Sequence, residues 1–242
     1  MRKLILSFLF VLSAMVGFAQ SFSKDKLFIS VEGGKGVLFG KSNLSPFGIG
    51  YRGGYDGGLM CNVKALYRID KFWVAGLKFN LSGTSANYAL DDGTNVADNV
   101  DLWYLGPQLG FKIPINERTF FSYVLGVGYL HYRNEGRSNA DFKCSSGAFA
   151  GNMDFGIEYK LTGHLAVNGG FSILTGDFKK IKMTLDDVEE TLRPDKLDRI
   201  YVRRLDFQLG LIFCFKYKYP RKKTSKVLII RNVKCLSGIE EG

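Results

Sequence analysis

The sequence lacks the features that mark helical membrane proteins and most enzymes. After its first twenty residues it has no run of about 18 apolar residues, which excludes helical membrane spans. Its four cysteines are scattered, with no CxxC spacing and no metal-ligand cluster. Paired catalytic carboxylates, a phosphate-binding loop and a dinucleotide signature are also missing. We therefore predict no metal site, no cofactor and no catalytic residues.

Histidine is equally scarce, with two residues in 242. His131 falls on the apolar row of a strand, without a serine two residues away, and His164 falls in a turn. A barrel enzyme acting on lipid A would need one of them as its base. Each is better explained as an interfacial or turn residue, so we predict that the protein is not an enzyme.

The N-terminus has the three regions of an export signal. Arg2 and Lys3 precede an apolar core over residues 4–16, and Gly17-Phe18-Ala19 places small residues where a signal peptidase reads. We expect residues 1–19 to be removed after Ala19. The alternative is a membrane anchor, but the apolar run is short and no stop-transfer charges follow it.

The net charge of +10 is a property of the C-terminal end. Residues 216–242 hold eight Lys or Arg against two Glu. We expect 220–242 to be a basic, disordered tail. Because the rest of the chain is nearly balanced, the basicity predicts no nucleic-acid partner.

Apolar and polar residues alternate in eight segments separated by polar, glycine-rich stretches. In 105–113, for example, leucine, proline, phenylalanine and isoleucine occupy one face, and glycine, glutamine and lysine the other. The segments are 27–31 (running on to 40), 59–69, 73–81, 105–113, 121–129, 149–159, 165–173 and 205–215. Connections are short at 70–71, 114–118 and 162–164, and long at 40–56, 82–100, 134–146 and 176–199. This pattern predicts an all-β fold over residues 20–219: an eight-stranded antiparallel up-and-down transmembrane β-barrel with short periplasmic turns.

The alternation alone also fits a soluble barrel with its apolar row inside. We favour lipid on the apolar row because the polar rows are rich in glycine, aromatics recur near strand ends, and loop lengths alternate. The polar row then faces the lumen and carries a charge network. Its members are Glu32, Lys64, Arg68, Lys78, Lys112, Asp154, Glu158, Arg204 and Asp206. Eight strands leave little room inside, so a lumen plugged by side chains is favoured over a narrow ion path.

The long loops are the best candidates for recognition of an extracellular ligand. The loop at 82–100 carries Asp91, Asp92 and Asp98, and the loop at 177–199 mixes lysines with acidic residues. Neither has the spacing of a calcium loop, and we expect both to be solvated.

The chain resembles the small outer-membrane β-barrel family, the OmpA/OmpX-like or porin-like eight-stranded proteins. The resemblance is carried by Phe18-Ala19-Gln20, by the strand over 104–111 and by the closing strand over 205–215 with its terminal aromatic. It implies a Gram-negative outer membrane with its lipids as surroundings, and a barrel-assembly machinery that reads Phe213 or Phe215. It also implies a structural or surface-interaction role. The alternatives are a narrow pore, an accessory barrel of a secretion apparatus with a periplasmic partner, and a lipid A-modifying enzyme.

Overall fold

A computed structural model describes residues 25–47, 55, 57–138, 140–185, 188–192 and 199–216. The predicted signal with Ala19 and the predicted tail at 220–242 lie outside these residues. Within the described part of the chain, no helix has the length and apolar character needed to cross a bilayer.

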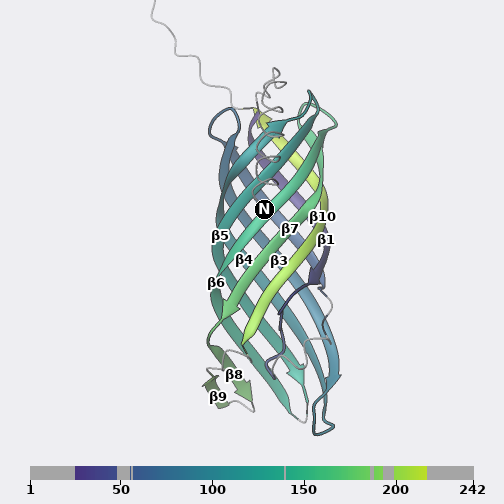
Figure 1. Ribbon diagram of the computed structural model, residues 1–242, viewed down its shortest axis with the longest axis vertical. Helices are drawn as coiled ribbons and strands as arrows, with labels where there is room; N and C mark the ends of the chain where they lie inside the picture. Colours follow the sequence, from purple (N-terminus) through teal and green to yellow (C-terminus); the bar gives the residue numbers. More distant parts are fainter. Residues whose placement is uncertain are drawn as a thin grey trace, which may run out of the picture.

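Eight long strands close into an antiparallel barrel (Figure 1). They are β1 (Asp25–Leu38), β2 (Leu59–Arg68), β3 (Trp73–Ala89), β4 (Asn95–Pro114), β5 (Thr119–Arg137), β6 (Asp141–Lys160), β7 (Leu165–Phe178) and β10 (Ile200–Lys216). Each pairs with its neighbour in the chain order, β10 pairs with both β7 and β1, and β5 pairs with β6. The predicted eight-stranded up-and-down barrel is confirmed.

The three predicted short turns lie together at one end of the barrel. Each is closed by backbone hydrogen bonds, such as Ile69 N–H to Trp73 O at 2.9 Å and Ile115 N–H to Thr119 O at 2.8 Å. The first residue of β1 faces the last residue of β10 at the same end. We call this the turn end and the opposite one the loop end.

At the loop end, three of the four long loops were predicted wrongly. Strands β3 and β4 stay paired as far as Ala89 and Asn95, and β5 and β6 as far as Arg137 and Asp141. The region 176–199 contains two further strands, β8 (Ile181–Leu185) and β9 (Val188–Leu192), which form a hairpin on β6 near the lower end of Figure 1. These stretches are polar because their outward residues face water, not because they are loops.

The polarity of the two barrel faces reverses towards the loop end. Between the turns and about the level of Trp103, the outward row is apolar and exposed, with Leu77 at 55 % and Leu209 at 74 %. Beyond that level the outward residues are mostly polar, with exceptions such as Leu59, and the inward residues form an apolar core like that of a soluble protein. This loop-end core consists of Leu44, Tyr55, Ala86, Val96, Val100, Leu102, Tyr104, Leu130, Tyr132, Phe142, Cys144, Ala150, Leu174, Phe178, Ile181, Ile200 and Val202. The prediction of a polar interior therefore fails for this part of the barrel, because there the outside meets water instead of lipid.

Glycines on the inward row let the strands curve tightly. A Cβ on Gly34 would lie 1.8 Å from the carbonyl oxygen of Phe207, and one on Gly170 would lie 2.0 Å from that of Phe155. A side chain at either position would collide with the backbone of the neighbouring strand. Glycine there lets the two strands approach closely on the inside of the barrel.

Candidate functional site: the lumen and its two ends

The nine charged residues predicted for the lumen all lie inside the barrel wall. Each is at most 7 % exposed. Five are cationic and four are anionic, so the set is close to neutral. The period-two pattern brings them to one interior surface because alternate residues of a strand point to the same face.

The central contact is an ion pair across the lumen. Lys78 Nζ on β3 lies 2.7 Å from Asp154 Oδ1 on β6 and donates a second hydrogen bond to Ser172 Oγ at 2.8 Å. The other oxygen of Asp154 accepts a hydrogen bond from Gln108 Nε2 at 2.6 Å. Strands β3 and β6 are not neighbours in the sheet, so this network bridges the interior.

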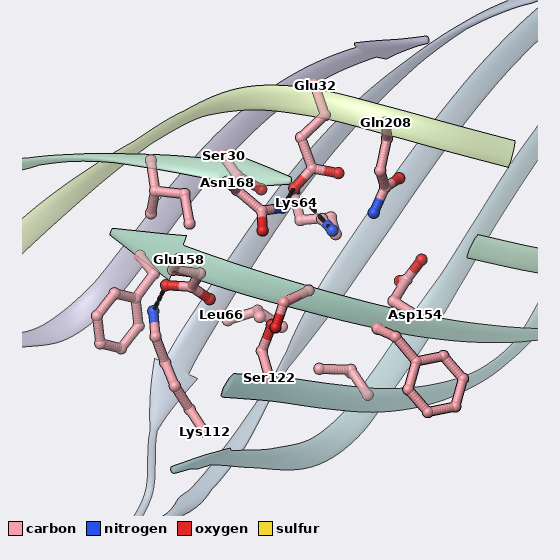
Figure 2. A pocket seen from close by; sticks show the side chains of 15 residues that line it. Ser30, Glu32, Lys64, Leu66, Lys112, Ser122, Asp154, Glu158, Asn168 and Gln208 are labelled. Carbon is pink, nitrogen blue, oxygen red and sulfur yellow. Dashed lines mark hydrogen bonds and ion pairs between the residues drawn. The ribbon is translucent and has the colours of Figure 1, made fainter. Parts of the chain in front are cut away.

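Further charges pair on both sides of this bridge, and Figure 2 shows two of these pairs, Lys64 with Glu32 and Lys112 with Glu158. Lys64 Nζ lies 2.8 Å from Glu32 Oε1, which also accepts a hydrogen bond from Asn168 Nδ2 at 2.8 Å. Lys112 pairs with Glu158. The guanidinium of Arg68 lies 5.0 Å from the ring centroid of Phe28. Towards the loop end, Arg204 Nε lies 2.6 Å from Asp206 Oδ1, and Arg204 Nη2 donates to Asn80 Oδ1 at 2.9 Å.

Two parts of the lumen were missing from the predicted network. Amides connect the charges, as when Asn62 donates to Gln208 at 2.7 Å and Asn80 to Asn62 at 2.6 Å. Their positions on the inward rows could have identified them. Asp25 is buried and pairs with Lys160 at the turn end, but it precedes the predicted start of the first strand.

Little open volume remains among these side chains. A cavity of about 20 Å³ lies between the residues drawn in Figure 2, which is room for about one water. Its wall towards the turn end includes members of a small apolar cluster, with Lys112 and Glu158 beside them. We call this cluster the turn-end plug: Phe28, Leu66, Val74, Val124, Ala166, Ile212 and Cys214. On the other side lies the loop-end core. Among the described residues, no cluster of three or more histidine, cysteine or acidic side chains could hold a metal ion.

Asp98 lies in the loop-end core, although it was predicted to sit in a solvated loop. The carboxylate is 2 % exposed and its Oδ2 accepts hydrogen bonds from Tyr55 at 2.6 Å, Tyr88 at 3.1 Å and Asn134 at 2.9 Å. Burial raises the pKa of Tyr88 to about 12, and burial together with the bond to Asp98 raises the pKa of Tyr55 well above its ordinary value.

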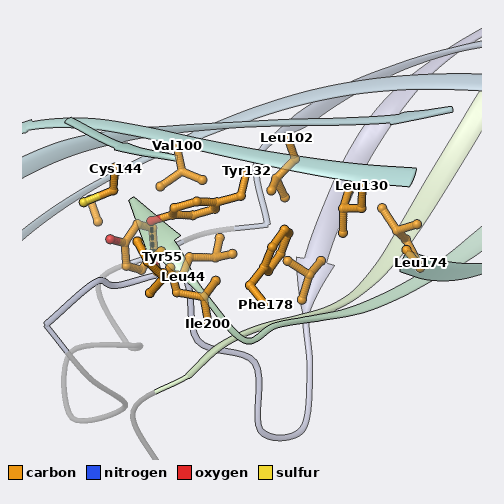
Figure 3. Packing of buried hydrophobic residues seen from close by; sticks show 14 of the residues in the cluster. Leu44, Tyr55, Val100, Leu102, Leu130, Tyr132, Cys144, Leu174, Phe178 and Ile200 are labelled. Carbon is orange, nitrogen blue, oxygen red and sulfur yellow. Dashed lines mark hydrogen bonds between the residues drawn. The ribbon is translucent and has the colours of Figure 1, made fainter. Parts of the chain in front are cut away.

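The segment that follows β1 folds into the mouth of the barrel (Figure 3). Leu44 is 1 % exposed, and its carbonyl oxygen accepts a hydrogen bond from the Tyr132 hydroxyl at 2.7 Å. Tyr55 brings the far end of the same loop to Asp98. The described parts of the loop at 39–58 therefore cap the loop-end core.

The remaining candidates lie outside the lumen. Phe213 and Phe215 are on the outward face of β10, 43 % and 48 % exposed, near the turn end. His131 faces outward, with its ring 5.3 Å from that of Trp103. His164 is exposed in a turn, with Nδ1 3.3 Å from the carbonyl oxygen of Cys214. Neither histidine contacts the charge network.

Comparison with known proteins shows a family and a fold. The family model described as outer membrane protein beta-barrel domain matches residues 8–199. No curated protein matches the chain by sequence.

Solved structures share the fold at low identity. A major outer membrane protein from Thermus thermophilus is 14 % identical, with a TM-score of 0.58 over 78 % of this chain and 99 % of that one. OprG from Pseudomonas aeruginosa is 14 % identical, with a TM-score of 0.52 over 82 % and 100 %. The outer membrane protease OmpT from Escherichia coli is 8 % identical, with a TM-score of 0.46 over 82 % and 99 %. At these identities the similarity concerns the barrel and not the activity.

Proposed function

The chain belongs to the outer membrane protein β-barrel domain family, and from this premise we propose a non-conducting barrel with a structural or surface-interaction role. The lumen is plugged by its own side chains. The turn end faces the periplasm and the loop end faces outward, since short turns are typical of the periplasmic side. Export by a signal cleaved after Ala19 and insertion through Phe213 or Phe215 belong to the same proposal.

The layered interior is the observation that supports a closed lumen. The turn-end plug and the paired charge network interlock, since Lys112 Nζ lies 3.6 Å from the Phe28 ring centroid, and the loop-end core follows them along the barrel axis. The contact between Lys78 and Asp154 spans the lumen where an ion would have to pass. A permeating ion would have to break buried pairs and then pass the loop-end core, which is apolar apart from Asp98 and its hydrogen-bonded partners, and this costs several kcal/mol.

Conductance in planar bilayers tests this part of the proposal. We expect no steady single-channel steps from the purified, folded protein, while a general porin in the same bilayer provides the positive control. Reproducible unitary steps that disappear when the protein is boiled before addition would contradict the closed lumen and favour the narrow pore.

The loop end supports a surface role. Strands β3 to β6 continue beyond the apolar band around a packed core, so the protruding rim is preorganised. An epitope inserted at Asp92, in the hairpin between β3 and β4, should be detected on intact cells. The same epitope at Asn116, in a short turn, should need permeabilised cells. The opposite pattern would reverse the proposed orientation.

A non-enzymatic role is supported by the positions of the histidines. His131 packs beside Trp103 on the outer wall, and His164 lies in a turn far along the barrel from it. Mass spectra of lipid A from cells with the protein, with His131→Ala and without the protein should be the same. A lipid A species made by the wild type and lost in His131→Ala would show an enzyme.

A further inference from the structure

The sheet of the barrel is interrupted on one side of β6. Strand β7 pairs with β6 only as far as Gly176 opposite Ala150, and β8 begins pairing with Lys182 opposite Ser145. Between these points, Gly147 to Phe149 have no strand partner on that side in the described registers, although β5 pairs with them on the other side. The chain crosses this interval at Lys179 and Lys180, leaving an open hollow of about 430 Å³ on the outer wall.

Positive charge collects at the hollow, where the described residues provide no ion-pair partner for it. Lys179 and Lys180 are both exposed, and no ion pair joins either one to a described carboxylate. Among the described residues, the only carboxylate lining the hollow is Asp177, which lies 3.9 Å from Arg199. Two neighbouring lysines are paired on the surface. Lys182 lies 2.8 Å from Glu189, and Lys143 lies 3.9 Å from Glu135.

An apolar side chain forms the other wall of the hollow. Phe149 is 89 % exposed, the largest exposure among the large apolar residues described. On the opposite side of β6 it faces Tyr129, and Gly147 faces His131. The ring of Tyr129 lies over Gly147, where a Cβ would come within 2.0 Å of the phenolic oxygen. Glycine at 147 therefore lets an aromatic hydroxyl lie at the edge of the hollow.

The hollow lies at the level where the outer wall changes from apolar to polar. Trp103 packs with its ring 5.4 Å from Tyr129 and 5.3 Å from His131, forming an aromatic belt. Such belts occur where hydrocarbon meets lipid headgroups. On the turn-end side of the belt Ile157 is exposed, and on the loop-end side Arg133 is exposed.

We propose that this hollow binds the phosphate-bearing headgroup of a membrane lipid in the leaflet at the loop end. Lys179 and Lys180 donate hydrogen bonds to the phosphate, and an acyl chain lies along Phe149 towards the apolar band. Both features are needed together, because lysines alone would bind any anion and an exposed phenylalanine alone would bind any lipid. The inference rests on the proposed placement of the barrel in the membrane.

Lipid retention tests the site with the whole protein. The barrel is reconstituted in phosphatidylcholine nanodiscs with a minor fraction of phosphatidylglycerol, extracted gently in detergent, and its bound lipids are counted by native mass spectrometry. The wild type should retain phosphatidylglycerol over phosphatidylcholine. The double variant Lys179→Gln/Lys180→Gln should lose this preference by about thirtyfold, since each of the two lysines near a lipid surface contributes about 1 kcal/mol.

A matched variant, Lys143→Gln/Lys182→Gln, removes the same charge from paired positions nearby and should keep the preference. Phe149→Ser should retain less of both lipids with its lysines intact. Equal losses in both double variants, or no preference in the wild type, would overturn the site. If inorganic phosphate at low concentration displaces the lipid, the hollow is a site for a free anion and not for a lipid headgroup. Heat-modifiable migration of each variant shows that the barrel is folded, and conductance is measured separately, so a failed lipid site leaves the closed lumen intact.

Discussion

Removing one partner of the cross-lumen ion pair should destabilise the barrel strongly. Lys78→Met takes away the ammonium group that lies 2.7 Å from Asp154, while the carboxylate itself stays inside the lumen at 3 % exposure. The amide of Gln108 still donates to it, but an amide does not neutralise its charge. Breaking a buried ion pair in this way costs about 3–5 kcal/mol, because the remaining charge stays desolvated.

Removing both partners should cost less than removing one. In Lys78→Met/Asp154→Leu neither charge of the pair remains, and the main losses are the hydrogen bonds to Gln108 and Ser172. Each is worth about 1 kcal/mol, so the double variant should lose about 2 kcal/mol. If the double variant loses less stability than the single variant, the loss in the single variant comes from the unpaired charge and not from the loss of packing around Lys78.

Unfolding by urea from lipid vesicles provides the assay, with tryptophan fluorescence as the signal. Both tryptophans, Trp73 and Trp103, are on the outward face and leave the lipid when the barrel unfolds. Lys182→Gln is the control, because it breaks an exposed pair with Glu189 and should cost less than about 1 kcal/mol. A Lys78→Met variant as stable as this control, or less stable only when Asp154 is also replaced, would refute the argument.

Three further predictions concern the lipid face, the inward glycines and the loop-end core. Leu209→Lys puts a charge on the apolar band and should lower stability by about 2–4 kcal/mol in the same unfolding assay; an unchanged midpoint would argue against lipid at that position. Gly170→Val should destabilise by more than about 1 kcal/mol because its Cβ meets the Phe155 carbonyl, whereas Gly33→Ala, with its nearest neighbour at 3.8 Å, should not. Tyr88 keeps its proton in the folded core up to a pKa of about 12, while an unfolded tyrosine ionises near 10. The loop-end core should therefore keep this stabilisation below about pH 10 and lose it as the pH rises towards 12. Tyrosinate absorbance and limited proteolysis, measured together against pH, check this, and ionisation of Tyr88 near pH 10 with no loosening of the core would contradict it.

The alternation in the sequence was enough to predict the barrel. Segments such as 105–113 have a period of two, which specifies a strand with two unlike faces, and eight of them with short turns at one end leave few other closed arrangements. The same alternation placed Lys78 and Asp154 on the inward faces of their strands. It could do so because successive side chains of a strand point to opposite faces, whatever the rest of the fold.

Tertiary structure decided how those residues meet. Lys78 and Asp154 are 76 positions apart and come together only because closure places β3 across the lumen from β6. Asp98 looked like a solvated acid because it lies in a stretch rich in Asp and Asn, yet it is buried. The alternation in a strand shows that its two faces differ in polarity. It does not show whether each face meets lipid, water or the barrel interior. That depends on the height of the residue relative to the apolar band, which is set by the tilt and length of all eight strands together.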